Sequence, residues 1–397
     1  MKRTLSGLLV FFALSSTALS QDIVWPKDVF AGPPATRQTD RFTEAGLESV
    51  FYDGLSKDGR PTDVFAYIGQ PSGTPPPGGW PAIVLVHGGG GTAFPQAVKY
   101  WNQKGFAAIA MDLEGHFPER QVDPEKRATT PHSGPVRFVG PAFGDLNEPI
   151  ENQWPFHAVG QTIRARRILA ARAEVNPRKI GILGWSWGGI LTSIAMGADP
   201  GYSFGIIIYG AGYLPESEGD LSAKGQPKDF QSKLLKTWDP STWLPKVVAP
   251  TFWVNGTNDR FFPLNTWQRS VDASGGSPRQ LIIPNMAHGH NAAWELAELD
   301  AFAKDVVNDK PFPSLSQPSR EGDMARSSVS GGVRPVASTL AFTRDSGPPV
   351  SRKWESAPAT VQGNTLAAAV PDGARQIFFS LTTEDGVRCS SPLLILP

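Results

Sequence analysis

The chain has 397 residues, and its 37 basic and 37 acidic side chains give a formal net charge of zero. This balance, without a long run of one sign, argues against nucleic acid or an anionic membrane surface as a partner. With 40% hydrophobic residues and 12 Trp, the composition predicts a large buried core, and the length predicts two domains or one domain with an appendage.

The first twenty residues have the pattern of a secretory signal. Lys2 and Arg3 precede an apolar stretch at 8–14 and small residues at 18–20. The apolar stretch is too short to span a bilayer, which argues against a membrane anchor. We therefore expect cleavage after Ser20 and a secreted or periplasmic protein that has no membrane span once the signal is removed.

Residues 21–312 alternate short apolar runs with helical patterns. Two segments, 47–53 and 63–69, predict an antiparallel edge. Further apolar runs predict buried parallel strands, and they begin at residues 81, 105, 179, 205, 250 and 279. Helical composition follows at 159–173, 189–196 and 293–307. The alternation predicts an α/β domain with a mostly parallel central sheet.

The remainder of the chain has a different composition. Residues 313–337 are rich in Pro, Ser and Gly and predict a linker. Residues 338–397 contain short alternating segments separated by turn residues, which predict a small antiparallel β module docked on the main domain. Cys389 is the single cysteine, so we expect no intramolecular disulfide, no thiolate zinc cluster and a buried thiol.

The strongest chemical signal is the sequence Gly-Trp-Ser-Trp-Gly-Gly at 184–189. It follows a predicted strand and precedes a predicted helix, which is the setting of a nucleophile elbow centred on Ser186. The bare pattern is weak, and an inert serine at a glycine-rich helix start is the alternative. The position between strand and helix favours a nucleophile.

A nucleophilic serine needs donors for a developing oxyanion. The sequence His-Gly-Gly-Gly-Gly at 87–91 follows the strand at 83–86, and its backbone N–H groups are unobstructed by side chains. We predict that Trp187 and Gly89 donate their N–H groups to the oxyanion. A phosphate-binding loop is less consistent, because no Gly-Lys-Ser/Thr follows. We expect His87 to orient the loop.

The acid and the base should follow the serine in the chain. Asp259 comes just after the predicted strand at 251–254, and the motif Asn-Met-Ala-His-Gly-His at 285–290 follows the next strand. Either His288 or His290 reaches the same sheet edge, and we favour His288 because it comes first and lies between Ala and Gly. Alternatives are Asp259 as a solvated turn residue and the two histidines as metal ligands, for which no third ligand is evident. We expect no metal and no cofactor.

These segments resemble secreted bacterial members of the α/β-hydrolase superfamily, in particular acetylxylan esterases and dienelactone hydrolase-like carboxylesterases, which adjoin the prolyl-oligopeptidase group. The similar segments lie at 175–189, 208–213, 238–245, 254–259 and 286–290. The resemblance implies an α/β-hydrolase fold and a triad of Ser186, Asp259 and His288 that cleaves an ester through an acyl-enzyme. Acetylxylan esterases often have a Tyr in the oxyanion loop, where this chain has only glycines.

We expect a small-molecule or carbohydrate ester as substrate, such as an acetylated sugar. Residues predicted to line its pocket are Trp185, Tyr209, Tyr213, His116 and Trp154. Asp112, Glu114 and His116 follow a strand and either bind substrate or fix their loop. Two other functions stay open, a serine peptidase of prolyl-oligopeptidase type and a non-catalytic carbohydrate-binding protein on a hydrolase scaffold.

Overall fold

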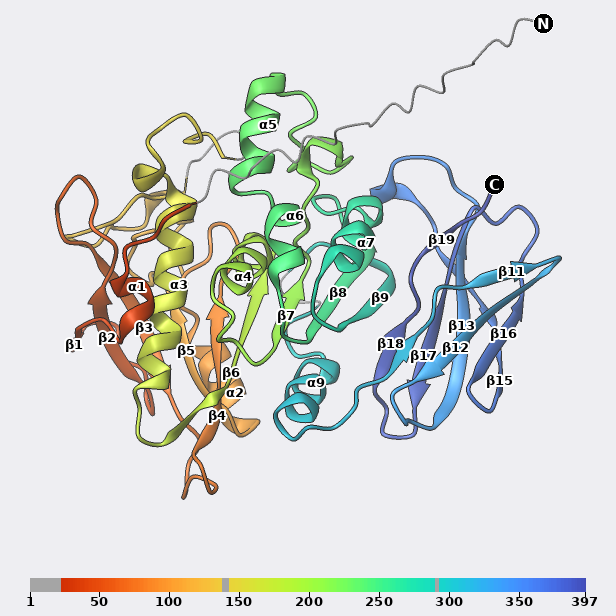
Figure 1. The fold of residues 1–397 in the computed structure, drawn as a ribbon, viewed down its shortest axis with the longest axis horizontal. Helices are drawn as coiled ribbons and strands as arrows, with labels where there is room; N and C mark the ends of the chain where they lie inside the picture. Colours follow the sequence, from red (N-terminus) through yellow and green to blue (C-terminus); the bar gives the residue numbers. More distant parts are fainter. Residues whose placement is uncertain (1–22, 138–142, 290–292) are drawn as a thin grey trace, which may run out of the picture.

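The computed structural model describes residues 23–137, 143–289 and 293–397. A mixed sheet of nine strands with helices on both faces forms the larger part, and a β module at the C-terminal end lies beside it (Figure 1). The predicted signal segment and its cleavage point after Ser20 lie outside the described residues, as does His290.

The main sheet is parallel at its centre and antiparallel at one edge. In spatial order its strands are β1 (Thr36–Gln38), β2 (Glu48–Asp53), β3 (Asp63–Gly69), β5 (Ala107–Met111), β4 (Trp80–Val86), β6 (Val175–Trp185), β7 (Gly205–Ile208), β8 (Thr251–Asn258) and β9 (Pro278–Ala287). The strands from β5 to β9 pair in parallel, whereas β1, β2, β3 and β5 pair antiparallel. The predicted parallel sheet with an antiparallel edge is confirmed.

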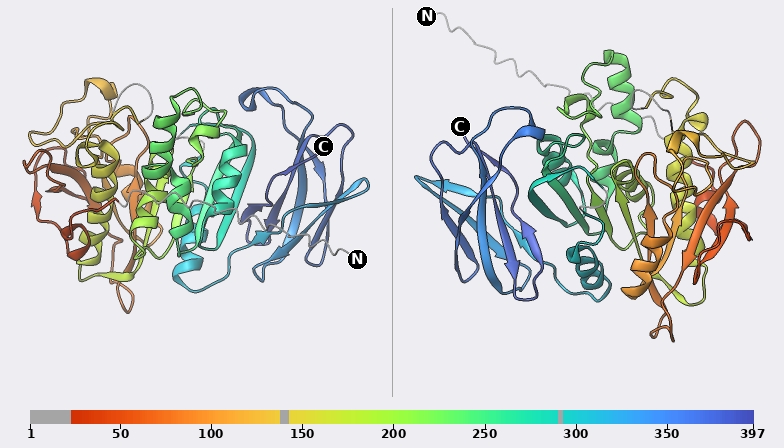
Figure 2. Two further views of the ribbon diagram at one scale, coloured as in Figure 1. Left: turned by 45° about the horizontal axis from the view of Figure 1, so that its top comes forward. Right: turned by 180° about the vertical axis from the view of Figure 1, so that it is seen from behind.

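Helices cover both faces of this sheet, which explains why its central strands are apolar on both sides. The helices are α1 (Asp28–Ala31), α2 (Pro95–Gln103), α3 (Trp154–Ala170), α4 (Trp187–Ala198), α5 (Lys228–Thr237), α6 (Pro240–Trp243), α7 (Leu264–Ala273) and α9 (Ala297–Val307). Helices α3, α4 and α7 lie on one face, and α2 and α9 lie on the other (Figure 2). Helix α3 begins at Trp154, five residues before its predicted start, because Pro155 occupies the first turn, where its missing N–H costs nothing.

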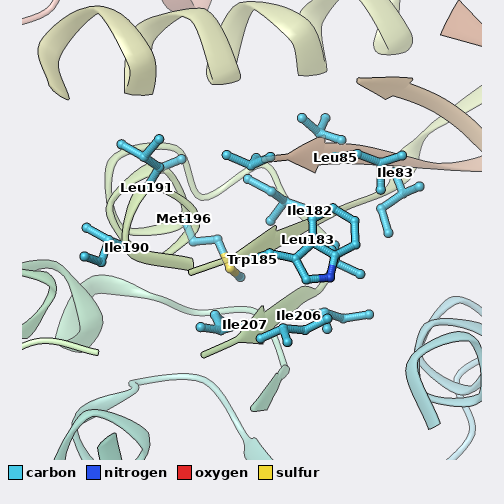
Figure 3. Close-up of a cluster of buried hydrophobic side chains, with 14 of the residues drawn as sticks. Ile83, Leu85, Ile182, Leu183, Trp185, Ile190, Leu191, Met196, Ile206 and Ile207 are labelled. Atoms are coloured by element: carbon cyan, nitrogen blue, oxygen red, sulfur yellow. The ribbon is translucent and has the colours of Figure 1, made fainter. Parts of the chain in front are cut away.

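The core beneath the predicted serine is made of large aliphatic side chains. Figure 3 shows Leu85 of β4, Ile182 of β6, Ile207 of β7 and Leu191 of α4 in one buried cluster, and each is at most 2% exposed. Full burial of such a side chain contributes about 1.5–3 kcal/mol. This packing holds β6 and α4 together, and the turn between them carries Ser186.

The C-terminal module is a pair of antiparallel sheets around its own small core. One sheet contains β10 (Ser314–Leu315), β11 (Ser319–Glu321), β12 (Met324–Ser330), β16 (Thr365–Ala369) and β15 (Thr360–Gln362). The other contains β14 (Glu355–Pro358), β13 (Pro335–Thr343), β17 (Gln376–Thr383), β18 (Arg388–Ser390) and β19 (Leu394–Ile395). Cys389 is 1% exposed there, and burial raises the pKa of its thiol to about 12.

The prediction that residues 313–337 form a linker is wrong. Strands β10, β11 and β12 lie within this range, and β12 pairs with β16 over five residues. Along β12 the side chains alternate between buried and exposed, but the buried ones are Ala325, Ser327 and Val329. The two-residue period of a strand is therefore present, and small or polar side chains hide it.

Candidate active site

The turn between β6 and α4 holds Ser186 in a backbone conformation that L-residues rarely adopt, with φ of 57° and ψ of −117°. A Cβ atom on Gly184 would lie 2.1 Å from the carbonyl oxygen of Gly188, and one on Gly188 would lie 2.2 Å from the carbonyl oxygen of Val86. A larger residue at either position would have to displace the backbone. The glycines thus permit a strained strand-to-helix turn, which is the geometry of a nucleophile elbow.

Ser186, His288 and Asp259 form a hydrogen-bonded chain at the carboxyl ends of β6, β9 and β8. His288 Nε2 lies 3.0 Å from Ser186 Oγ, and His288 Nδ1 lies 2.8 Å from Asp259 Oδ2. Because a carboxylate accepts and does not donate, Nδ1 carries the ring proton, and Nε2 is free to accept from the serine hydroxyl. Of the two candidate histidines, His288 makes these contacts.

Asp259 is held firmly in this chain. It is 0% exposed, and its Oδ1 accepts the backbone N–H groups of Phe261 and Phe262 at 2.8 and 2.9 Å. Its second oxygen therefore points to His288 with little freedom to rotate. This placement differs from that of a solvated turn residue, which was the alternative for Asp259.

The ring of His288 is packed between aromatic side chains. Its centroid lies 4.4 Å from that of Tyr209, 4.8 Å from Phe261 and 5.9 Å from Phe262. Tyr209 also donates its hydroxyl to the carbonyl oxygen of Gly289, at 3.0 Å. Burial and the nearby charge of Asp259 raise the pKa of Tyr209 to about 12, so this hydroxyl keeps its proton and its donor role at neutral pH. Tyr209 thus fixes the loop that carries the histidine.

The glycine loop after β4 is anchored by its own amides. Gly90 N–H donates to Glu114 Oε1 at 2.9 Å, and Gly91 N–H donates to Gly88 O at 2.9 Å. Buried Arg127 donates to the carbonyl oxygens of Gly90 and Gly91. With these amides engaged, the loop's remaining N–H groups are those at its first two glycines, including the predicted donor at position 89.

The predicted oxyanion donors come from neighbouring segments. A Cβ atom on Gly89 would lie 2.6 Å from Trp187 Cδ1, so the glycine loop packs directly on the start of α4. Trp187 is the first residue of that helix, and the first N–H groups of a helix have no partner within it. The arrangement is compatible with both N–H groups serving one oxyanion, and their roles stay a prediction.

Two charged residues lie beside this loop, and only one of them, Glu114, was singled out from the sequence. Glu114 is 5% exposed and accepts Arg137 Nε at 2.9 Å as well as the Gly90 amide. The Arg137 guanidinium lies 6.0 Å from the ring centroid of Trp187. Arg137 belongs to an insert without periodicity, so no sequence signal connects it to the glycine loop.

Hydrogen bonds to Asp112 fix the loop after β5, which was one of the two interpretations of this residue from the sequence. Asp112 is 2% exposed and accepts the Thr92 hydroxyl and the amides of Glu114 and His116, at 2.7–2.9 Å. His87 accepts Leu113 N–H at Nε2, so its Nδ1 carries the proton and donates to the carbonyl of the next residue. His87 therefore orients the loop.

The aromatic residues predicted to line the pocket lie in packed surroundings. Trp185 is 2% exposed and stacks on Trp294 with centroids 4.8 Å apart. Trp154 is 3% exposed, donates its indole N–H to Leu113 O and meets Trp187 edge-on at 5.5 Å. Packing accounts for both positions.

Tyr213 lies under the guanidinium of Arg269, 3.9 Å from its ring centroid. The backbone N–H of His116 is engaged with Asp112, as described above, and its Nδ1 is buried without a hydrogen-bond partner among the residues that the structure describes. None of these contacts is with the Ser186 chain. Substrate binding by Trp185, Tyr209, Tyr213, His116 and Trp154 stays a prediction.

Comparison with solved structures identifies the architecture. The acetyl xylan esterase from Paenibacillus sp. R4 matches with a TM-score of 0.54 at 18% identity, over 70% of this chain and 89% of the esterase. The chain has the α/β-hydrolase fold. Acetyl xylan esterase 1 from Thermoanaerobacterium sp. JW/SL YS485 matches with a TM-score of 0.51 at 14% identity, over 70% of this chain and 88% of that esterase. Identities this low establish the fold alone.

Sequence comparison adds a partial family match. The profile of a family described as PhoPQ-activated pathogenicity-related protein matches residues 220–343, less than half of the chain. The matched range contains Asp259 and His288 and does not contain Ser186. No curated protein sequence matches the chain.

Residues 23–137, 143–289 and 293–397 hold no helix that is long and apolar enough to cross a bilayer. In the same ranges no three His, Cys, Asp or Glu side chains are grouped so that they could hold a metal ion.

Proposed function

We propose that this α/β-hydrolase is a serine hydrolase that cleaves carboxylic esters through an acyl-enzyme. The observation that carries the proposal is the continuous hydrogen-bonded chain from Ser186 Oγ through His288 to Asp259, with distances of 3.0 and 2.8 Å. Serine at a strained elbow, a neutral imidazole as base and a buried carboxylate that orients it are the parts of nucleophilic acyl transfer.

The first half of the reaction follows from the protonation states in the chain. Ser186 Oγ attacks the ester carbonyl carbon while its proton passes to His288 Nε2, and the carbonyl π electrons move onto the oxygen. The imidazolium that forms is stabilised by the Asp259 carboxylate. The oxyanion is stabilised by the N–H groups of Trp187 and Gly89, a contribution of about 3 kcal/mol per donor in related enzymes.

The second half returns the enzyme to its starting state. The carbon–oxygen bond to the alcohol breaks, and the alcohol leaves with the proton from His288 Nε2. Water then attacks the acyl-serine, giving its proton to the same nitrogen, and Ser186 recovers its proton as the carboxylic acid departs. No redox step and no added co-reactant other than water is needed.

The proposed substrate is an ester with a small acyl group, such as an acetylated carbohydrate. The ring of Trp187 next to the glycine loop is enclosed by Phe143 and Trp154, with centroids at 5.0 and 5.5 Å, and this crowding supports a short acyl chain. The two fold relatives named above are acetyl xylan esterases, which supports the same choice. The N-terminal signal pattern supports action outside the cytoplasm.

The test is hydrolysis of p-nitrophenyl esters of increasing acyl length, with acetylated xylan as a natural substrate and Ser186→Ala as the control. We expect acetyl esters to be cleaved fastest and the variant to be inactive above background. Equal rates for the wild type and the variant would refute the proposal. Faster cleavage of aminoacyl nitroanilides than of esters would instead indicate a peptidase.

A further inference from the structure

Two asparagines connect the ends of β8 and β9, which lead into the loops of the acid and the base, to the C-terminal β module. Asn258 directly precedes Asp259, and Asn285 lies three residues before His288. Both side chains bond to the backbone of one segment, 350–354, in the module's connection between β13 and β14.

The contact of Asn285 is reciprocal. Its Nδ2 donates to Trp354 O at 2.8 Å, and its Oδ1 accepts Trp354 N–H at 3.0 Å. Asn285 has φ of 58°, a left-handed conformation that Asn adopts more readily than most residues. The Trp354 side chain is 5% exposed and packs on Phe378. The module therefore holds the Trp354 backbone, to which Asn285 bonds, in a fixed position.

The contact of Asn258 extends this connection to the acid loop. Its Nδ2 donates to Val350 O at 3.1 Å and to Arg352 O at 2.7 Å. The Thr257 hydroxyl donates to Asn258 Oδ1 at 2.7 Å and accepts Asn285 N–H at 2.8 Å. The ends of β8 and β9 are thus bonded to each other and to the same module segment.

These bonds are additional to those that dock the module. Nearer the start of β9, Ser390 Oγ accepts the N–H of Ile282 and donates to its carbonyl oxygen. Gln280 Nε2 donates to Ser391 O, and all of these bonds are buried. Arg388 pairs with Glu298 of α9. The module would therefore remain attached without the two asparagines, whose contacts lie where the catalytic loops leave the sheet.

We propose that the β module positions the Asp259 and His288 loops of the active site through Asn258 and Asn285. The inference rests on the proposed serine-hydrolase function. The module would then help to set the geometry of the reaction. This geometry matters because a shift of the imidazole by about 1 Å can lower the rate as much as a hundredfold. The asparagines act through Asp259 and His288 and are positioning residues.

The experiment compares Asn258→Ala and Asn285→Gly with the wild type in the full-length protein. Glycine at position 285 tolerates the left-handed backbone and removes only the side-chain bonds. The matched control is Glu298→Gln, which weakens a contact of the module with α9 that involves neither asparagine. We expect each asparagine variant to lower kcat for p-nitrophenyl acetate about tenfold with KM changed less than twofold, and the control to keep the wild-type kcat.

A second measurement does not depend on turnover. The proton between His288 Nδ1 and Asp259 should give a far-downfield proton NMR resonance, which we expect to broaden or vanish in both asparagine variants and to persist in Glu298→Gln. Wild-type kcat and an unchanged resonance in the asparagine variants would overturn the positioning role. If instead the wild type and Ser186→Ala have equal rates, the proposed function fails, and the resonance alone decides the role of the module.

Discussion

Replacement of Asp259 by Asn should abolish most activity by changing the histidine tautomer. In the wild type, Asp259 Oδ1 accepts the N–H groups of Phe261 and Phe262, and Oδ2 faces His288 Nδ1 at 2.8 Å. An amide nitrogen cannot accept those two N–H bonds, so the asparagine oxygen must take the Oδ1 position. The amide NH₂ then donates to Nδ1, the ring proton moves to Nε2, and Nε2 can no longer accept the proton of Ser186.

The magnitude follows from the loss of the base. The equivalent change in a serine protease triad lowers kcat about 10⁴-fold, which corresponds to about 5.5 kcal/mol in the activation barrier. Because the two backbone bonds to the side-chain oxygen are retained, the free energy of unfolding should change by less than about 1 kcal/mol.

The assay is steady-state hydrolysis of p-nitrophenyl acetate together with urea unfolding. Asp272→Asn is the matched control, since Asp272 lies on α7 and accepts only a Gln268 side-chain bond among the hydrogen bonds of the described residues. We expect the control to retain full activity. A loss smaller than tenfold in Asp259→Asn, or an equal loss in Asp272→Asn, would refute the tautomer argument.

Three further variants test separate parts of the account. Gly188→Ala places a Cβ 2.2 Å from the carbonyl oxygen of Val86, so it should lower the free energy of unfolding, measured by urea titration, by about 3 kcal/mol. Its control is Gly225→Ala, which has open space around the new Cβ and should not lower that free energy. Tyr209→Phe removes the hydroxyl bond that holds the histidine loop and should lower kcat about threefold to tenfold, with loss of about 1 kcal/mol of stability; an unchanged kcat would show that the ring alone suffices. Burial lowers the pKa of His157 to about 4, so the free energy of unfolding should fall by up to about 3 kcal/mol as the pH drops from about 6.5 toward 4. The free energy of unfolding should therefore differ less between pH 7 and pH 4.5 in His157→Gln than in the wild type.

Sequence patterns predicted the sheet well, for physical reasons. Strands buried on both faces must be continuously apolar, so β4, β6 and β8 stand out against the polar turns around them. The elbow leaves no room for a Cβ at positions 184 and 188, so both positions are glycine, and the sequence shows this directly. Ser186, Asp259 and His288 then lie, in chain order, at the carboxyl ends of β6, β8 and β9, with His288 within hydrogen-bonding distance of the other two.

Long-range contacts were beyond the sequence. Trp154 packs on Trp187, and Trp185 stacks on Trp294. Each of these partners lies far along the chain from the tryptophan that it contacts, so the sequence does not show whether Trp154 and Trp185 face a ligand or a neighbouring ring. The strand at 324–330 was missed because its buried positions are small. The module's contact with Asn285 joins residues 69 positions apart, and an asparagine before a turn gives no sign of it.

The central claim is that Ser186 is the nucleophile, and the most direct measurement is the intact mass of the protein after rapid mixing with p-nitrophenyl acetate and acid quenching. The account predicts a mass increase of one acetyl group, located by peptide mapping to the segment that contains Ser186, and no such increase in Ser186→Ala. Hydrolysis of the ester without an acetylated Ser186, or an equally acetylated Ser186→Ala protein, would contradict it.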